Sequence, residues 1–212
     1  MQFSSQLLEN TVKEFSKLPG IGKKTALRLV LHLIKQPAAE VAQFSEALHK
    51  LKTNALQCVQ CNNIADTKLC TICANTLRKQ GTVCVVEGLK EVIAIESTQQ
   101  YNGVYHILGG VISPLDGVGP DQLYIQNLLT RLQQMDQPIT ELIFALNPNT
   151  QGDTTIYYIQ KKIAQLHLTM PPTVTTISRG IAFGGELEYA DEMTLARSLQ
   201  NRLPIENYVS QQ

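Results

Sequence analysis

The sequence predicts an α/β protein in which a helical N-terminal region precedes a mostly parallel β-sheet. Up to about residue 55, apolar residues recur at helical spacing, whereas after residue 80 short β-rich runs alternate with helical runs. Between the two regions, four of the five cysteines fall within residues 58–73. The expected organisation is therefore a helical module, a small cysteine-rich segment and an α/β domain.

The composition is that of a folded protein. Apolar residues make up 43% of the 212 residues and charged residues 17%, which excludes a disordered chain. No apolar run is long enough to span a bilayer, and the N-terminus lacks the pattern of a secretion signal. We therefore expect a cytoplasmic protein with no membrane partner, in which paired cysteines bind metal or act as redox thiols.

The charge is divided unevenly along the chain. Residues 1–80 contain 11 Lys and Arg against 5 Asp and Glu, whereas residues 81–212 contain 7 against 13. The basic N-terminal part indicates an anionic partner, although uneven charge is also common in small proteins.

Three helices are expected in the N-terminal region. The first covers residues 1–17 and ends at LPGIG (18–22), because Pro and Gly do not continue a helix. The second, KKTALRLVLHLIK, ends before Pro37. In the third, apolar residues fall on one face: Ala38, Val41, Phe44, Leu48, Leu51 and Ala55.

The LPGIG turn between two helices is typical of a helix–hairpin–helix. Gly20 and Gly22 are expected to adopt backbone angles that other residues avoid, which exposes N–H groups at the next helix start. A helix N-terminus favours phosphate, Lys23 and Lys24 follow at once, and Arg28 lies one turn beyond Lys24. The pattern predicts a site that binds the nucleic-acid backbone and does not recognise the bases. The alternative is a plain helical turn with solvated lysines.

The cysteine segment has two CxxC pairs separated by eight residues. Cys58, Cys61, Cys70 and Cys73 can supply four thiolates to one tetrahedral Zn²⁺ per chain. Four protein ligands leave no open position, so we expect a structural site; a redox role normally needs one CxxC pair. The fifth cysteine, Cys84, lies in a buried-strand pattern and is expected to be a core thiol.

The C-terminal part alternates strands and helices, which predicts a mostly parallel sheet covered on both faces. The expected strands are TVCVVEG (82–88), VYHILGG (104–110), TELIFALNP (140–148) and TVTTISR (173–179). The expected helices cover residues 91–100, 121–135, 153–167 and 190–202.

The strand end at Glu87 resembles the first acidic position of a Toprim fold, whose enzymes act on nucleic-acid backbones with Mg²⁺. Such chemistry needs several carboxylates around the metal. Glu91 lies one helical turn after Glu87, but the usual Asp-x-Asp pair is missing, and ALNPNTQGD supplies only Asp153. The incomplete set argues against a Mg²⁺-dependent nuclease, which remains the alternative function.

The motifs occur in the order LPGIGKKTALRLVLHL, the four cysteines, YHILGGVISPLDGVGP and GGELEYADEMTLARSL. In this order the chain resembles the bacterial RecR family of recombination mediators over nearly its whole length. The resemblance implies a helix–hairpin–helix DNA-binding module (1–56), a four-cysteine zinc finger (57–79), a Toprim domain (80–173) and a C-terminal strand–helix segment (174–212). By the same resemblance, the last segment is expected to be related to a Walker B strand and to serve packing and oligomer contacts.

The resemblance also implies a non-enzymatic role in DNA repair, near the nucleoid. Family members form dimers and ring-shaped tetramers, and with RecO and often RecF they help RecA displace single-strand-binding protein and load at gapped DNA. Lys24 and Arg28 match the family's basic pair, the four cysteines match its zinc ligands, and Glu87, with Glu91 nearby, matches an acidic position that contacts RecO. A general zinc-ribbon DNA-binding adaptor is a third possible function.

The chain departs from the family pattern at three acidic positions. Gly88 stands where Asp is common, Gln151 replaces a carboxylate, and Asp153 is shorter than the usual Glu. These departures affect the expected partner contacts and do not restore a catalytic site.

Overall fold

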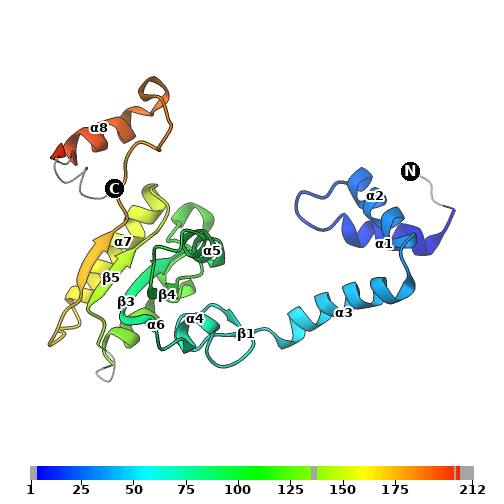
Figure 1. Cartoon of the computed structure of the whole chain (residues 1–212), viewed down its shortest axis with the longest axis horizontal. Coiled ribbons are helices and arrows are strands. Elements are labelled where there is room, and N and C mark those ends of the chain that lie inside the picture. The colour runs from blue at the N-terminus through cyan, green and yellow to red at the C-terminus, as the bar shows by residue number, and fades with distance from the viewer. Residues whose placement is uncertain (1–3, 135–137, 203, 206–212) are drawn as a thin grey trace. The chain divides into compact units, whose positions relative to one another are not determined.

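The computed structural model describes residues 4–134, 138–202 and 204–205 (Figure 1). The chain divides into two compact units, residues 1–55 and 56–212. Within the described ranges, no helix has the length and apolar character needed to cross a membrane.

The N-terminal unit contains the three expected helices: α1 (Gln6–Phe15), α2 (Lys23–Ile34) and α3 (Ala38–Asn54). The Ser5 side chain caps α1 by accepting a hydrogen bond from the Leu8 N–H, which satisfies a free donor of the first turn. Helices α1 and α2 pack around a small core; its buried members are Val12, Ala26 and Val30. This packing forms the hairpin.

Helix α3 leaves its apolar face uncovered. None of its residues is buried, and Phe44, Leu48 and Leu51 are 44%, 55% and 61% exposed. The predicted stripe of apolar residues is therefore present on a helix that contributes nothing to the core of the single chain.

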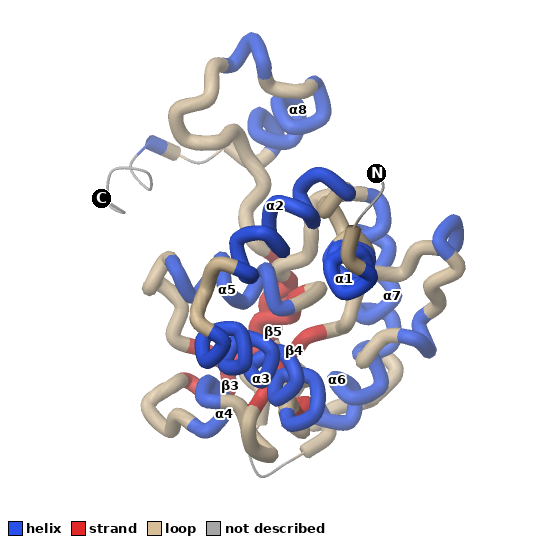
Figure 2. The backbone as a smooth tube through the Cα atoms, turned by 90° about the vertical axis from the view of Figure 1, so that its right-hand side faces the viewer, coloured by secondary structure: helices blue, strands red, loops and turns tan. Residues whose placement is uncertain are grey.

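The second unit contains a parallel sheet in the order β4–β3–β5–β6, drawn in red in Figure 2. The strands are β3 (Lys79–Val86), β4 (Gly103–Ile107), β5 (Glu141–Phe144) and β6 (Thr173–Thr176). All three pairings are parallel, as the sequence predicted. The carboxyl ends of the strands therefore meet at one edge, where ligands of such sheets usually bind.

Helices cover both faces of this sheet. Val83 and Val85 of β3 pack with α6 (Ile125–Leu132) and α7 (Thr150–Ala164), which form the larger core. Cys84 and Val86 point to the other face, where Val92 of α5 (Leu89–Ser97) covers them. Cys84 is 2% exposed, so its predicted place in the core is confirmed.

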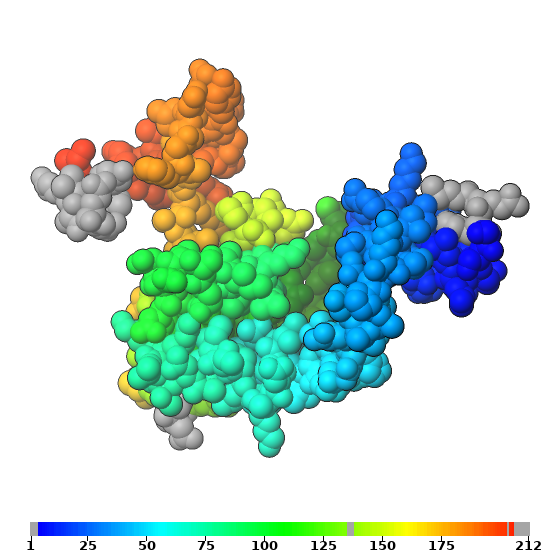
Figure 3. All heavy atoms as spheres, turned by 45° about the vertical axis from the view of Figure 1, so that its right-hand side comes forward, coloured from blue at the N-terminus to red at the C-terminus, as the bar shows by residue number. Residues whose placement is uncertain are grey.

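A small finger precedes the sheet. It consists of an antiparallel pair, β1 (Leu56–Gln57) and β2 (Ile64–Ala65), and the short helix α4 (Thr71–Ala74). Helix α4 contacts β4, and Ile72 packs against the sheet's two cores. In the space-filling view, the atoms of the finger (cyan) adjoin the green atoms of the segment that follows it (Figure 3).

The remaining elements are three 3₁₀ turns and the last helix. The turns are η1 (Pro114–Asp116), η2 (Pro120–Gln122) and η3 (Leu187–Tyr189), and the helix is α8 (Glu192–Gln200). The predicted helix over 121–135 begins later than expected, at Ile125, because Leu123 adopts an extended conformation after η2. Met135, its expected last residue, lies outside the described residues.

Candidate functional site

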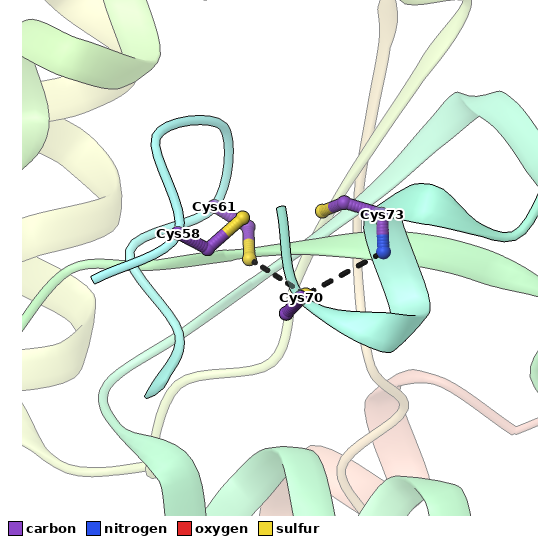
Figure 4. Close-up of side chains that lie close together, drawn as sticks. All are labelled: Cys58, Cys61, Cys70 and Cys73. Atoms are coloured by element: carbon purple, nitrogen blue, oxygen red, sulfur yellow. Dashed lines mark hydrogen bonds between the residues drawn. The ribbon is translucent and has the colours of Figure 1, made fainter. Parts of the chain in front are cut away.

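The four finger cysteines converge on one point (Figure 4). The sulfur atoms of Cys58, Cys61, Cys70 and Cys73 all lie within 4.8 Å of one another, and all four residues are buried. Tetrahedral zinc with Zn–S bonds of about 2.3 Å holds its sulfur atoms about 3.8 Å apart. The four thiols therefore fit a zinc ion, with no open coordination position for water or substrate.

Local backbone geometry explains why these residues meet. Asn62 has a φ of 64°, a left-handed conformation that Asn tolerates, and it turns the chain directly after Cys61. The turn is closed by two hydrogen bonds: Asn62 N–H donates to the Cys58 carbonyl at 2.9 Å, and Cys58 N–H donates to the Asn63 carbonyl at 2.8 Å. On the other side, Cys70 caps α4, which carries Cys73.

Electrostatics of the thiols favour a bound cation. The hydrogen bond with Cys73, burial and the neighbouring charge raise the pKa of the Cys61 thiol well above its usual range. Burial also acts to raise the pKa of Cys58, but backbone N–H groups at Cys70, Cys61 and Gln60 outweigh it and hold that pKa at about 7. Four thiolates cannot coexist here without a cation that offsets their mutual repulsion.

The hairpin turn differs from the prediction at one glycine. Gly20 has a φ of +78°, the left-handed region that favours glycine. Gly22 has a φ of −79°, which any residue adopts, so the expectation of a special backbone angle at Gly22 was wrong. Gly22 has a different role: as the N-cap of α2 it offers no side chain, so no side chain caps the N-terminal N–H groups of that helix.

The basic residues of the hairpin lie at the surface. Lys23, Lys24 and Arg28 are all exposed on α2, and none forms an ion pair with another residue of the described ranges. Lys24 and Arg28 are spaced by one helical turn, so their side chains project from the same face. Their charges are thus available to an anionic ligand.

The sheet's carboxyl edge carries Glu87 directly after β3. Its Oε1 accepts a hydrogen bond from the Asn147 N–H at 2.7 Å, in the loop after β5. That loop is tight: Asn149 caps α7 by accepting from Gly152 N–H at 2.8 Å, and a Cβ on Gly152 would lie 2.2 Å from the Asn147 carbonyl. The turn thus requires glycine at this position.

Glu91 points back to the start of its own helix. Its Oε2 accepts a hydrogen bond from the Gly88 N–H at 2.9 Å, a capping contact for α5. Glu87 and Glu91 are therefore not simply two free carboxylates one turn apart. Each has one oxygen occupied by a backbone N–H group, and both residues are half-buried.

Asp153 makes a contact that the sequence did not reveal. Its carboxylate pairs with Arg179, which follows β6, and more loosely with Arg197 of α8 at 3.4 Å. The hydrogen bond from Arg179 holds the pKa of Asp153 below its usual value. Since Arg179 follows β6, which runs parallel to β5, its position at this edge could have been inferred from topology; that of Arg197 could not.

Among the described residues, the four cysteines are the only cluster of three or more possible metal ligands. Glu87, Glu91 and Asp153 do not converge, and the partners of each are a backbone N–H group or an arginine.

Comparison with known proteins covers each part of this architecture. The family profile described as "RecR, helix-hairpin-helix" matches residues 8–52, and the profile of the RecR zinc finger domain with four cysteine ligands matches residues 57–75. The Toprim domain profile matches residues 81–173, and "RecR, C-terminal" matches residues 180–203.

The curated relatives agree. Recombination protein RecR of Amoebophilus asiaticus is 52% identical over 203 residues, which cover 96% of this chain and 98% of the relative. The chain belongs to the RecR family. The RecR proteins of Flavobacterium johnsoniae and Bacteroides thetaiotaomicron are also 52% identical, over 97% and 95% of this chain and 97% and 95% of their own lengths.

Membership in the RecR family confirms the predicted α/β fold with its helix–hairpin–helix, four-cysteine zinc finger and Toprim domain. It also supports a role in DNA recombination and repair. The geometry of the finger matches the name of its profile, because four buried cysteines stand within coordination distance of one metal.

Proposed function

We propose that this chain is a non-enzymatic recombination mediator. It binds DNA as an oligomer and, with RecO and RecF, promotes RecA loading on gapped DNA covered by single-strand-binding protein. The observation that carries this proposal is the uncapped N-terminus of α2, flanked by exposed basic residues, within a RecR-type hairpin.

DNA would be held through its phosphates. Gly20 turns the backbone, and Gly22 leaves the first N–H groups of α2 without a side-chain cap. The exposed residues Lys23, Lys24 and Arg28 add positive charge. Contacts of this kind neutralise phosphates and release counterions, so the affinity would fall steeply with salt and depend little on base sequence.

A single structural Zn²⁺ would occupy the four-cysteine site of each chain. The finger is too small to bury a core of its own, so metal binding would supply much of its folding free energy. We propose one role for each part of the chain. Residues 1–56 bind DNA, and residues 57–79, the zinc finger, join them to the Toprim domain. Residues 80–173 bind partners, and residues 174–212 form oligomer contacts.

A dimer or tetramer is supported by apolar surface in the N-terminal unit. A groove of about 680 Å³ runs between α1, α2 and α3, lined by Leu7, Leu8, Val30, Leu33 and Ile34, among others. A second copy of this chain is the proposed occupant, since association would cover surface that the single chain leaves exposed. Several hairpins in one ring would then bind DNA through effective concentration.

The partner surface is proposed at Glu87 and Glu91. Among the described residues, the second oxygen of each carboxylate has no hydrogen-bond partner, so both can accept donors from a basic protein such as RecO. Residues 81–212 also carry excess negative charge, which would steer such a partner.

The absence of catalysis is part of the proposal. Mg²⁺ chemistry needs carboxylates that meet at one point, and Asp153 is paired with arginines instead. Nicking of supercoiled DNA that depends on Mg²⁺ and is lost in Glu87→Gln would favour the alternative, a Toprim nuclease.

Light scattering of the protein with and without gapped DNA and RecO tests the proposal as a whole. We expect an oligomer that forms a larger complex with both ligands. A monomer that binds neither DNA nor RecO would exclude the mediator function.

A further inference from the structure

Arg131, near the end of α6, is a buried cation. It is only 7% exposed, although burial of a guanidinium is costly unless opposite charge or several hydrogen bonds compensate it. Within the described part of the chain, no carboxylate lies within ion-pair distance of Arg131. Nothing in the sequence indicates this, because Arg131 stands in an ordinary amphipathic pattern.

The hydrogen bonds of Arg131 do not account for a full charge. Its Nη1 donates to the Tyr105 carbonyl at 2.8 Å and, more weakly, to the Gln60 carbonyl at 3.4 Å. Its Nη2 is buried without a partner among the described residues. Two carbonyl dipoles thus face a cation whose other end has no protein acceptor.

Arg131 contacts the finger beside two of its metal-ligand candidates. Gln60, whose carbonyl Arg131 contacts, lies between Cys58 and Cys61 in the chain. Burial lowers the pKa of Arg131, whereas the field of Cys73, Cys61 and Cys58 acts to raise it. Four thiolates on one Zn²⁺ retain two uncompensated negative charges, which a buried guanidinium can offset.

The finger is also fastened to the strand that Arg131 contacts. The Ile107 N–H donates to the Cys61 carbonyl at 2.8 Å, and Asn62 Nδ2 donates to the Ile107 carbonyl at 3.2 Å. Arg131 bridges the same two parts, since Tyr105 belongs to β4 and Gln60 to the finger. Arg131 therefore adds a third link between the finger and β4, beside those made by Cys61 and Asn62.

We propose that Arg131 is a positioning residue for the metal site: its guanidinium supplies the counter-charge of the zinc-bound thiolates and holds the finger on β4. Outer partners of metal ligands commonly set the affinity of a site, although they do not touch the metal. The inference rests on the zinc site proposed above.

Three full-length variants test it, each purified with zinc and compared with the unchanged protein. Arg131→Met removes the charge at similar length, and Arg131→Lys keeps the charge. Thr155→Val is the matched control: Thr155 is fully buried in α7 and accepts a hydrogen bond from Ile112 N–H at 2.9 Å. Its loss should destabilise the Toprim domain without removing a hydrogen bond of the finger. Competition with a chromophoric chelator gives the zinc dissociation constant of each.

We expect Arg131→Met to weaken zinc binding by about 10- to 100-fold, the usual range for outer partners of a metal site. Arg131→Lys should lose clearly less, and Thr155→Val should lower the melting temperature without changing zinc affinity. Unchanged zinc affinity in Arg131→Met, an equal loss in Arg131→Lys, or the same loss in Thr155→Val would each overturn the proposal.

If Arg131→Met does not fold, Arg131→Lys decides alone: affinity close to that of the unchanged protein supports the counter-charge, and a loss of about tenfold or more contradicts it. If the unchanged protein purifies without zinc and does not bind it, the zinc site itself fails. If the unchanged protein holds zinc and the Arg131 variants hold it equally well, only the role of Arg131 fails.

Discussion

The carboxylate of Glu87 accepts a hydrogen bond from the backbone N–H of Asn147, at 2.7 Å. The contact joins the end of β3 to the loop after β5, at the edge of the sheet where Toprim enzymes assemble their metal site. In this chain Glu87 holds the loop after β5, and that loop carries the amides Asn147 and Asn149. The geometry is that of a fixed acidic surface, which suits recognition of a partner.

The Glu87→Gln variant should remove the negative charge of Glu87 and keep its contact with the Asn147 N–H group. The amide oxygen of Gln can still accept the Asn147 N–H, so the melting temperature should change little, while affinity for RecO should fall and lose part of its salt dependence. Calorimetric titration with RecO at two salt concentrations measures this. An interaction with RecO that is indifferent to salt in the unchanged protein would contradict the acidic-surface account.

Replacing Asp153 by Asn should loosen the C-terminal segment. The pair with Arg179 is partly exposed, so its loss should cost only about 0.5–1 kcal/mol of stability, but cleavage near Arg179 in limited proteolysis should accelerate. Glu188→Gln, an exposed acid in the same segment, is the control. Equal cleavage rates in all three proteins would show that the ion pair does not anchor the segment.

The Arg78–Glu96 pair should make stability depend on pH. The hydrogen bond from Arg78, helped by one from the Tyr105 hydroxyl at 2.7 Å, holds the pKa of Glu96 below its ordinary value of 4.5. The folded state thus binds this proton less readily than the unfolded state, and the contribution is present above pH 4.5 and lost as pH falls through the lower folded value.

Glu96→Gln should therefore be less stable than the unchanged protein by about 2 kcal/mol near neutral pH. The difference should shrink as pH falls below the ordinary value of 4.5. Urea unfolding at several pH values gives both curves. A difference that stays constant down to the lowest pH would exclude ionisation of Glu96 as its source.

Loss of one zinc ligand should affect stability before it affects DNA contacts. Cys58→Ser, or removal of zinc by a chelator, should lower the melting temperature and disturb assembly, because the proposed metal would supply folding free energy to the finger. Atomic absorption and light scattering follow zinc and oligomer together. An unchanged melting temperature and oligomer with loss of DNA binding would make the finger a contact site.

Patterns that are local in sequence predicted most of this fold. Apolar spacing indicated the three N-terminal helices, alternation of strands and helices indicated the parallel sheet, and the CxxC spacing indicated the buried cluster. The prediction at Gly22 was wrong because a helix-hairpin-helix turn needs only one left-handed residue here, Gly20. The start of α6 was misplaced because the η2 turn and an extended Leu123 intervene.

Contacts between segments that are far apart in the chain could not be predicted from the sequence. Nothing in a single sequence pairs Asp153 with Arg197, 44 residues away, or brings Arg131 to Gln60, 71 residues away. Likewise, the uncovered apolar face of α3 is visible only once the core is known, because its periodicity is that of any packed helix.

DNA binding by the hairpin is the central claim, and the salt dependence of binding to gapped DNA tests it most directly. Lys24→Ala with Arg28→Ala should weaken binding and reduce the slope of log affinity against log salt by about 1.8 for each engaged hairpin. Lys35→Ala with Lys52→Ala, which removes the same charge from exposed positions of the same unit, should change it far less. An unchanged affinity and slope in the Lys24 and Arg28 double variant would contradict the account.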